Sequence, residues 1–316
     1  MSRTAQNRQT RQTRQPGRWG RLLRTGILAA VLAVVAFVVP NSGVAPTYFS
    51  LVKFEHAEGV DTDPDVIWIL AVGSDARRGQ DPLRSRGDTL QLVGLDTRTG
   101  AATTIGIPRD SWVSIPGYGS NRVNAALYFG GPQLLGETVA GLIGIEPDYV
   151  FVASFWGVEQ VAKDIGPITV DNPVSFSDPY LKPKGFKAGK VVLSGYNVVS
   201  FARIRKNLAG GDFDRSANQQ RVLKGFQAKV AENADKPGWI ENGVLSVIDN
   251  VHTDLDPAEL FAIAQAVAQV DPRKITNCVV PGGIGNVGAA SVVLPNTSTA
   301  KRYGDDARND ATIKRC

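Results

Sequence analysis

The stretch Val66-Ile-Trp-Ile-Leu-Ala-Val-Gly-Ser-Asp75 (VIWILAVGSD) is a short apolar run that ends in a glycine, a serine and an aspartate. A continuous apolar run of this length, closed by glycine, predicts a buried strand. Downstream, the segments 89–95 and 102–107 flank the turn-like sequence Asp96-Thr-Arg-Thr-Gly100. Two such segments on either side of a short polar turn predict a β-hairpin. The folded part of the chain therefore begins with three strands, the last two of them antiparallel.

Helical and extended patterns alternate after this hairpin. Helices are predicted at residues 124–128, 132–143, 155–165, 194–205, 215–233 and 257–270, and strands at 148–153, 275–280 and 291–294. Asp256 before Pro257 is a favourable N-cap followed by proline at the first helical position. Strands interleaved with helices over residues 66–295 predict a single α/β domain in which helices cover a sheet.

The N-terminal 45 residues differ in composition from the rest. Residues 1–24 contain seven arginines and no acidic residue, and removing those charges from the formal net charge of +5 leaves −2 for the remainder. The remainder thus lacks the basic footprint of a nucleic-acid-binding domain, and no nucleic acid is expected as a partner. Residues 25–39 carry no charge, and the next charged residue is Lys53. We expect a cytoplasmic basic tail (1–24), a single-pass transmembrane anchor (25–45) and a linker (46–65), with the domain outside the cell membrane.

The alternative for the apolar segment is a cleaved signal peptide. Small residues stand at Gly43 and Ala45, but Pro46 would follow the cut and disfavours it. We therefore expect the anchor to be retained.

Histidines and cysteines are too few for several kinds of catalytic site. The two histidines, His56 and His252, support neither a serine–histidine–acid triad nor zinc binding. The two cysteines, Cys278 and Cys316, are a possible disulfide pair in an extracytoplasmic protein, and the pair would tie the polar tail (296–316) to the domain. Residues 283–288 match the dinucleotide glycine pattern, yet they lie between two β-type runs and favour a glycine-rich hairpin.

Arginines and aspartates stand at the ends of the predicted strands. Asp75 follows the first strand, Arg86 and Asp88 precede the second, and Arg109 follows the third. In an α/β sheet, ligands usually bind in the loops beyond the strand ends. Because the second and third strands are predicted to be antiparallel, the start of one and the end of the other share an edge. Arg86, Asp88 and Arg109 are therefore expected to converge.

A second charged cluster begins the helix predicted at 215–233. Arg215 and Gln219 are four residues apart and continue the apolar face of this helix, so both are expected to point inward. A buried arginine needs a partner. That partner is either Asp212, as a structural pair, or an anion in a pocket.

Phosphate fits these groups. Planar guanidinium groups bind phosphate oxygens in paired hydrogen bonds. Asp75 and Asp88 can hold a hard cation such as Mg²⁺ that also binds phosphate. Arginines and such a cation together stabilise the charge of a phosphoryl group in transfer.

The motifs resemble those of the LytR-CpsA-Psr family of cell-wall ligases. The matching pieces, in order, are Leu70-Ala-Val-Gly-Ser-Asp75, Arg86-Gly-Asp-Thr-Leu90, Ile107-Pro-Arg-Asp110, Val123-Asn-Ala-Ala126 with Gly130-Gly131, Arg203-Ile-Arg205, and Gly211-Asp-Phe-Asp-Arg215 with Gln219-Gln-Arg221. The resemblance covers most of the domain and not the tail after Asn296. Gly87 stands where the family more often has serine, and Asp214 where glycine is common.

The resemblance implies an α/β/α sandwich around a mixed central sheet and a set of site residues. Asp75 and Asp88 would hold Mg²⁺ (or Mn²⁺) and, with Arg109, form the catalytic group. Those implied to bind or orient a polyprenyl pyrophosphate are Arg86, Arg109, Arg203, Arg205, Arg215, Asp212 and Gln219. The lipid would occupy an apolar cleft, for which the predicted helices around 125–143 and 155–161 are the candidate walls.

The implied reaction attaches a polyprenyl-pyrophosphate-linked glycopolymer to peptidoglycan and releases polyprenyl phosphate. The Ala-, Gly- and Arg-rich composition is compatible with a GC-rich actinobacterium and hence with arabinogalactan, and a teichoic-acid-like polymer is the other expectation. Two alternatives remain open: a polyprenyl pyrophosphate hydrolase, and a non-catalytic regulator or scaffold of the cell envelope.

Overall fold

The computed structural model describes residues 48–54, 66–77, 79–242, 244 and 251–316. The predicted cytoplasmic tail (1–24), the predicted transmembrane anchor (25–45) and most of the predicted linker lie outside these residues. Among the residues that are described, no helix has both the length and the apolar character needed to cross a bilayer.

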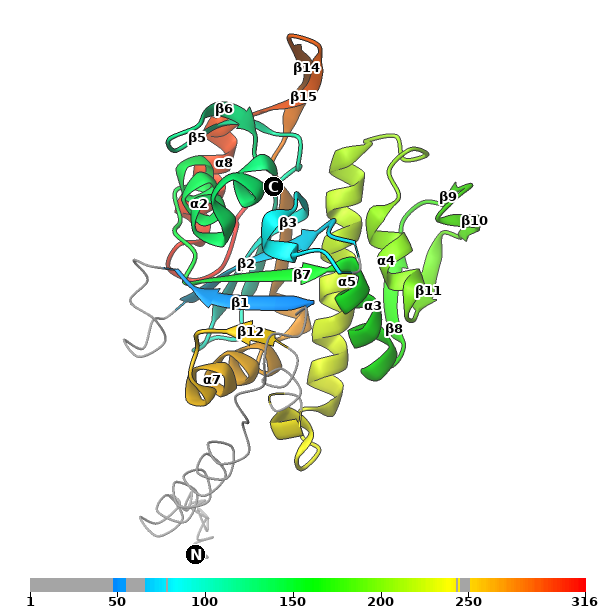
Figure 1. Ribbon diagram of the computed structural model, residues 1–316. Helices are drawn as coiled ribbons and strands as arrows, with labels where there is room; N and C mark the ends of the chain where they lie inside the picture. The colour runs from blue at the N-terminus through cyan, green and yellow to red at the C-terminus, as the bar shows by residue number, and fades with distance from the viewer. Residues whose placement is uncertain (1–47, 55–65, 78, 243, 245–250) are drawn as a thin grey trace, which may run out of the picture. The chain divides into compact units, whose positions relative to one another are not determined.

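A mixed sheet of seven strands forms the centre of the domain (Figure 1), in the order β12-β1-β7-β2-β3-β4-β13. The strands are β1 (Phe49–Lys53), β2 (Val66–Ser74), β3 (Gly87–Asp96), β4 (Ala102–Gly106), β7 (Tyr149–Ser154), β12 (Val251–Thr253) and β13 (Ile275–Val279). β3 pairs antiparallel with both β2 and β4, which confirms the predicted hairpin. β7 and β13 run parallel to their neighbours β2 and β4.

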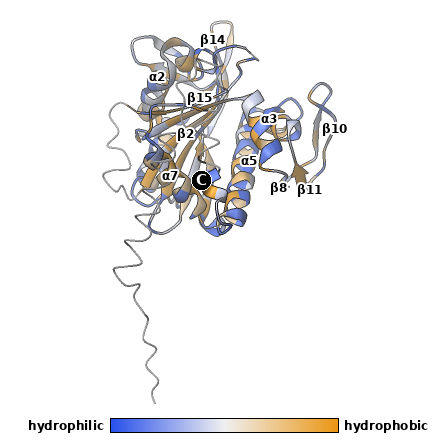
Figure 2. Ribbon diagram, turned by 60° about the horizontal axis from the view of Figure 1, so that its bottom comes forward, coloured by the Kyte–Doolittle hydropathy of each residue, from blue (hydrophilic) through white to orange (hydrophobic). Residues whose placement is uncertain are grey.

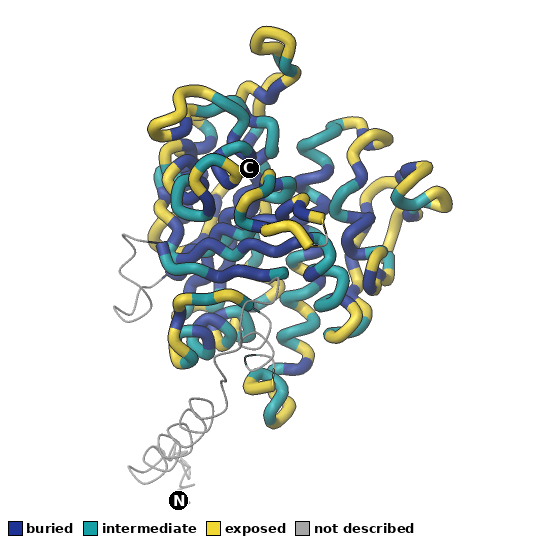
Figure 3. The backbone as a smooth tube through the Cα atoms, viewed as in Figure 1, coloured by how far each residue is buried: buried dark blue, intermediate teal, exposed yellow. Residues whose placement is uncertain are grey.

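Helices cover both faces of this sheet, as the alternation along β2 requires. Leu70 and Val72 join the core formed with α2 (Ala125–Ile143) and α8 (Thr297–Ala307). Ile67 points to the other face and joins the core formed with α7 (Pro257–Ala268). Successive side chains of a strand point to opposite faces, so an apolar run such as 66–72 needs cover on both sides. Figure 3 shows the central strands of the sheet largely buried, and most residues of β2, β3, β4 and β7 are buried.

A satellite core lies beyond α5 (Asp212–Asn233), which contacts β3, β4 and α7 on one side. Its elements are α3 (Phe155–Asp164), β8 (Ile168–Asn172), β9 (Phe176–Asp178), β10 (Lys182–Phe186), β11 (Gly189–Leu193) and α4 (Tyr196–Arg203). The rings of Phe176, Phe186 and Phe201 pack together there, with centroids 5.2–5.5 Å apart. Apolar residues recur along α5 between polar ones (Figure 2), because the helix is covered from both sides.

Two hairpins complete the described chain, β5 (Trp112–Ile115) with β6 (Gly119–Arg122) and β14 (Gly282–Val287) with β15 (Ala290–Pro295). The second is the predicted glycine-rich hairpin, and its residues 283–288 lead into β15 and not into a helix. The dinucleotide interpretation of residues 283–288 is thereby excluded.

Two of the predicted boundaries are wrong. Part of the predicted linker (46–65) is β1, which lies in the sheet between β7 and β12. The predicted polar tail (296–316) begins with α8, whose buried residues Ala300, Tyr303, Gly304 and Ala307 follow helical spacing and pack against α2. Asn296 caps this helix by accepting a hydrogen bond from the backbone N–H of Thr299. A disulfide joins Cys278 to Cys316 and ties the end of the chain to β13, as the cysteine count suggested.

Candidate functional site

The end of β2, the start of β3 and the end of β4 lie together at one end of the sheet. Ser74 at the end of β2 pairs with Gly87 at the start of β3, and Gly106 at the end of β4 pairs with Gln91. The backbone N–H of Asp75 donates to the carbonyl of Arg86 at 3.0 Å, and that of Asn124 to the carbonyl of Arg109 at 3.3 Å. The loops after β2 and β4 are thus held beside the start of β3. This confirms the predicted convergence of Arg86, Asp88 and Arg109.

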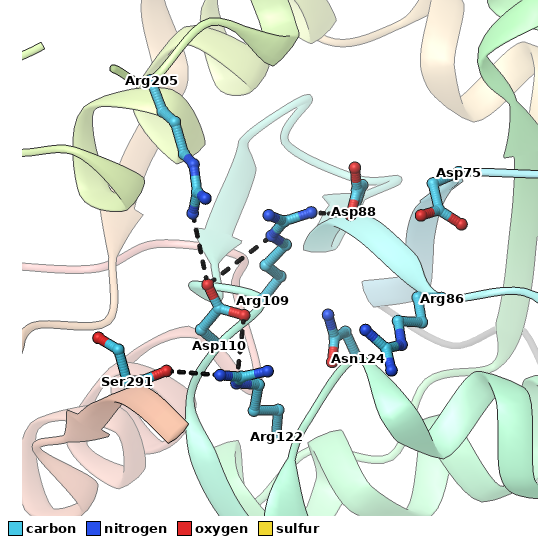
Figure 4. A pocket seen from close by; sticks show the side chains of 9 residues that line it. All are labelled: Asp75, Arg86, Asp88, Arg109, Asp110, Arg122, Asn124, Arg205 and Ser291. Carbon is cyan, nitrogen blue, oxygen red and sulfur yellow. Dashed lines mark hydrogen bonds and ion pairs between the residues drawn. The ribbon is translucent and has the colours of Figure 1, made fainter. Parts of the chain in front are cut away.

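A cavity of about 280 Å³ opens at this end of the sheet (Figure 4). Its lining residues are Asp75, Arg86, Asp88, Arg109, Asp110, Arg122, Asn124, Arg205 and Ser291. Four arginines face three aspartates, so one positive charge is in excess. A small cavity with this lining is suited to an anion with several charges.

Asp110 lies at the centre of the arginines. Its carboxylate oxygens are 3.8 Å from Nε of Arg109, 3.6 Å from Nε of Arg122 and 3.6 Å from Nη1 of Arg205. Figure 4 shows the three guanidinium groups converging on this carboxylate from different elements. Nη2 of Arg122 also donates to the carbonyl oxygen of Ser291 at 2.8 Å, which ties β15 to the cavity. The aspartate therefore gathers the arginines without neutralising them all.

Arg109 also forms an ion pair with Asp88, through Nη1 and Oδ1. Burial alone would lower the pKa of Arg109, yet the nearby carboxylates of Asp88, Asp110 and Asp212 raise it above the usual value. Arg109 is consequently a permanent cation held between two carboxylates, with its Nε buried and without a hydrogen-bond partner.

Asp75 and Arg86 have no ion-pair partner among the described residues. The carboxylate of Asp75 accepts a hydrogen bond of 2.5 Å from the hydroxyl of Ser85, and both Asp75 and Arg86 are exposed. Figure 4 places Asp75 on the same side of the cavity as Asp88. No cluster of three or more His, Cys, Asp or Glu side chains occurs in the described part of the chain. Two carboxylates still fit Mg²⁺, which commonly binds one or two carboxylates together with substrate phosphates and water.

Asp212 and Arg215 lie behind the cavity wall, where Asp212 contacts the backbone of Arg109. Arg215 is buried, with 4% of its surface exposed, and its Nη2 is 2.5 Å from Oδ1 of Asp212. The other carboxylate oxygen of Asp212 accepts a hydrogen bond of 3.1 Å from the backbone N–H of Arg109. Burial raises the pKa of Asp212, against the lowering by Arg215. Of the two partners considered for Arg215, the structure shows Asp212, and neither residue lines the cavity.

Gln219 also lies behind the cavity and not on its surface. It is buried, and its Oε1 accepts a hydrogen bond of 3.1 Å from Nε2 of Gln91. Ser216 and Gln220 extend this polar layer, which packs directly on β4 at Gly106. A Cβ at Gly106 would lie 2.3 Å from the Ser216 hydroxyl, so glycine is needed there for α5 to approach the sheet.

Arg203 is the predicted residue that lies furthest from expectation. Its guanidinium carbon is 4.4 Å from the ring centroid of Phe155, in a cation–π arrangement, and it does not line the cavity. The residues that sequence reasoning did not propose are Asp110, Arg122, Asn124 and Ser291. Asp110 and Asn124 lie within the family motifs, so their place in a motif could have identified them as site residues. Nothing local pointed to Ser291, which is brought in by the β14–β15 hairpin.

A second cavity, of about 460 Å³, is apolar and lies on the α7 face of the sheet. α5 contributes Leu223, Phe226 and Val230, α7 contributes Ile263 and Val267, and β2, β3 and β4 form the floor. The helix α5 begins at Asp212, behind the polar cavity, and reaches the apolar cavity at Phe226. These two residues are 14 positions apart, which is about 21 Å along the helix axis. The predicted walls of an apolar cleft were different. α2 packs into the core on the opposite face instead, and α3 belongs to the satellite core.

Fold and site together describe an α/β protein with an arginine-rich cavity at one end of the sheet and a separate apolar cavity on its α7 face. A model of the LytR_cpsA_psr family matches residues 43–308, and the chain belongs to this family. The match begins before β1 and includes α8, in agreement with the corrected domain boundaries.

Relatives of known name are about 30% identical to this chain over the aligned residues. The polyisoprenyl-teichoic acid–peptidoglycan teichoic acid transferase TagU of Bacillus anthracis (strain CDC 684 / NRRL 3495) is 31% identical over 195 residues, 61% of this chain and 62% of that protein. The regulatory protein MsrR of Staphylococcus aureus (strain COL) is 31% identical over 194 residues, 60% of this chain and 58% of that protein. The chain thus spans about three fifths of the length of these relatives.

Solved structures share the fold. The crystal structure of Bacillus subtilis TagV is 26% identical, with a TM-score of 0.65 over 79% of this chain and 99% of that one. TagT bound to LI-WTA is 20% identical, with a TM-score of 0.65 over 85% of this chain and 98% of that one. The likeness to TagT is evidence for the fold alone.

Proposed function

We propose that this protein transfers a glycopolymer from a polyprenyl pyrophosphate carrier to peptidoglycan. The observation that carries the proposal is the arginine- and aspartate-lined cavity, from which α5 leads to a separate apolar cavity. A lipid pyrophosphate has both parts, a multiply charged head and an apolar tail. TagU, a relative over three fifths of its length, is named for such a transfer.

In the proposed reaction, a sugar hydroxyl of peptidoglycan attacks the phosphorus next to the glycan. A new P–O bond forms, the bond from that phosphorus to the bridging oxygen breaks, and polyprenyl phosphate leaves with that oxygen while the hydroxyl proton passes to solvent. Negative charge spreads over the phosphoryl oxygens during this exchange. Arg86, Arg109 and Arg205 lie where they would bind those oxygens.

Arg109 has the central role in this proposal. Its guanidinium is protonated at any working pH, and its position between Asp88 and Asp110 limits its motion. Asp212 accepts a hydrogen bond from the backbone N–H of Arg109, and Arg215 holds the carboxylate of Asp212 in place. Both residues therefore act by orienting Arg109. Arg203 and Gln219 would support this arrangement without touching phosphate.

Asp75 and Asp88 would hold Mg²⁺ (or Mn²⁺), which would neutralise phosphate charge. Asp75 is the stronger part of that assignment, because it is exposed and has no ion pair among the described residues. The lipid tail would lie against α5 and α7, and the proposed anchor at 25–45 would keep the domain at the outer face of the cell membrane. The polymer would be arabinogalactan or a teichoic-acid-like chain.

Incubation of the purified full-length chain with a polyprenyl-pyrophosphate-linked saccharide, Mg²⁺ and peptidoglycan tests the proposal. A saccharide–peptidoglycan product is expected, and Arg109→Lys should slow its formation by roughly 10²- to 10³-fold, as for loss of one transition-state donor. Arg302→Ala, a change on the exposed face of α8, is the control that should keep wild-type rates. Formation of saccharide phosphate and polyprenyl phosphate without a linked product would show a hydrolase, and would refute transfer.

A further inference from the structure

An exposed aromatic cluster lies on the two elements that carry the cavity residues Arg122 and Asn124, and it has no role in the reaction described so far. It consists of Tyr118 at the tip of the β5–β6 hairpin and of Tyr128 and Phe129 near the start of α2. The rings of Tyr118 and Phe129 are stacked, with centroids 4.8 Å apart and planes 9° apart, and Tyr128 meets Phe129 edge-on at 6.0 Å. Tyr118 and Tyr128 are 54% and 58% exposed. Two tyrosine rings that each pack on Phe129 and yet are open to solvent suggest a contact surface.

The backbone holds this cluster in place. Gly117 and Gly119 flank Tyr118 with φ of 74° and 71°, values that L-residues rarely adopt, so the tip is shaped by glycine. The hydroxyl of Tyr118 donates to the carbonyl of Phe129 at 3.4 Å. Immediately after Phe129, Gly130 and Gly131 break the helical geometry of α2 and separate its first turn from the rest. The turn that carries Tyr128 and Phe129 is thus aimed independently of the long part of the helix.

The same elements also reach the cavity. Arg122, the last residue of β6, and Asn124, the N-cap of α2, both line it. Tyr128 is four residues after Asn124 and so lies on the same side of the helix, one turn further out. A polymer that leaves the cavity past Asn124 would therefore meet Tyr128 within about one helical turn, or 5.4 Å.

The cluster and the apolar cavity lie on opposite faces of the central sheet. α2 and the β5–β6 hairpin are on one side in Figure 1, whereas the apolar cavity lies against α7 and the other face. In phosphoryl transfer the attacking and leaving oxygens are roughly in line on opposite sides of the phosphorus. If polyprenyl phosphate leaves toward the apolar cavity, the attacking hydroxyl arrives from the α2 side.

We infer that Tyr118, Tyr128 and Phe129 form the docking platform for the acceptor, a glycan strand of peptidoglycan. The apolar faces of sugar rings stack on aromatic rings, and tyrosine adds a hydroxyl for hydrogen bonds at little conformational cost. Holding the acceptor strand there would place one of its hydroxyls at the cavity for attack. This inference rests on the proposed transfer for its direction, but the binding it predicts does not depend on turnover.

Binding of the full-length chain, in detergent, to insoluble peptidoglycan sacculi tests this directly. The double variant Tyr118→Ala/Tyr128→Ala should lose roughly tenfold in affinity, the order expected for two stacking contacts. Tyr118→Phe/Tyr128→Phe keeps the rings and should bind within about threefold of wild type. Tyr180→Ala removes a tyrosine that is 85% exposed between β9 and β10, and it is the matched control expected to bind as wild type. Circular dichroism checks that each variant is folded.

Steady-state kinetics give the second readout. The alanine double variant should have a higher KM for the peptidoglycan acceptor than wild type, and an unchanged KM for the lipid donor. The platform is overturned if Tyr118→Ala/Tyr128→Ala binds sacculi as tightly as wild type, or if Tyr180→Ala loses as much affinity as that double variant. Either result overturns it even if transfer is observed. Conversely, an absence of transfer by the wild type overturns the proposed function, and the sacculus assay then decides the platform by itself.

Discussion

Arg215→Ala should destabilise the domain strongly, because it leaves the buried carboxylate of Asp212 without its cation. The pair is 2.5 Å apart, with side-chain exposures of 5% and 10%. At an effective dielectric of about 20, opposite charges about 4 Å apart attract by about 4 kcal/mol. Removing one partner of a buried pair typically costs about 3–5 kcal/mol. For a domain of this size such a loss lowers Tm by roughly 10 °C.

Thermal and urea unfolding of the full-length chain measure this loss. Arg273→Ala is the matched control: Arg273 and Asp271 are 2.8 Å apart, but Arg273 is 88% exposed, so its removal should leave Tm unchanged within error. The double variant Asp212→Asn/Arg215→Met keeps an acceptor for the backbone N–H of Arg109 and removes both charges. It should recover most of the stability.

The loss should also depend on pH. Burial already raises the pKa of Asp212, and without Arg215 it should rise further. A carboxyl whose pKa is raised in the folded state imposes no penalty below its unfolded value of about 3.9, and the penalty grows as the pH rises through the folded value. The destabilisation by Arg215→Ala should therefore be small near pH 4 and large at pH 7. A loss as small as that of Arg273→Ala, or one that does not change with pH, would refute the assignment of Asp212 and Arg215 as a buried charged pair.

Three further predictions concern other parts of the chain. Cys316→Ser opens a link between residues 38 apart, and chain entropy predicts a loss of up to roughly 4 kcal/mol in urea unfolding that reductant should reproduce in the wild type. Gly131→Ala should lower stability by about 1–3 kcal/mol, because Gly131 has a φ of 71° and a ψ of −160°, a region that is essentially restricted to glycine. Gly141→Ala, in the regular part of the same helix with open space around it, should be neutral or slightly stabilising. Asp75→Asn should raise the Mg²⁺ concentration needed for half-maximal transfer, and an unchanged Mg²⁺ dependence would remove Asp75 from the metal site.

The elements that could be predicted are those with strong local patterns. The run 66–72 had to be a buried strand, the hairpin around 96–100 had a turn signal, and Asp256-Pro257 had a cap signal that the structure confirms. β1 was missed because its five residues have no clear alternation. It is stabilised by pairing with β7 and β12, about 100 and 200 residues away. α8 had readable spacing at Ala300, Tyr303 and Ala307, but its polar composition concealed it.

The site was predicted in its core and not at its rim. Antiparallel pairing alone implied that Arg86, Asp88 and Arg109 would meet, and helical spacing alone implied that Arg215 and Gln219 would be buried. Whether Arg215 would meet an anion or Asp212 depended on a 2.5 Å contact that no spacing rule determines. The gathering of Arg109, Arg122 and Arg205 around Asp110 likewise depends on where β4, β6 and α4 end in space.

The sequence by itself therefore determined the α/β class, the charged edge of the sheet and the family resemblance, since hydrophobic periodicity and short motifs are local properties. Only the tertiary structure decided which arginines line the cavity, which one is neutralised behind it, and that the apolar cavity lies between α5, α7 and the sheet. The physical reason is distance. Electrostatic partners and cavity walls are chosen over a few ångströms in space, by packing between segments that are tens to hundreds of residues apart in the chain.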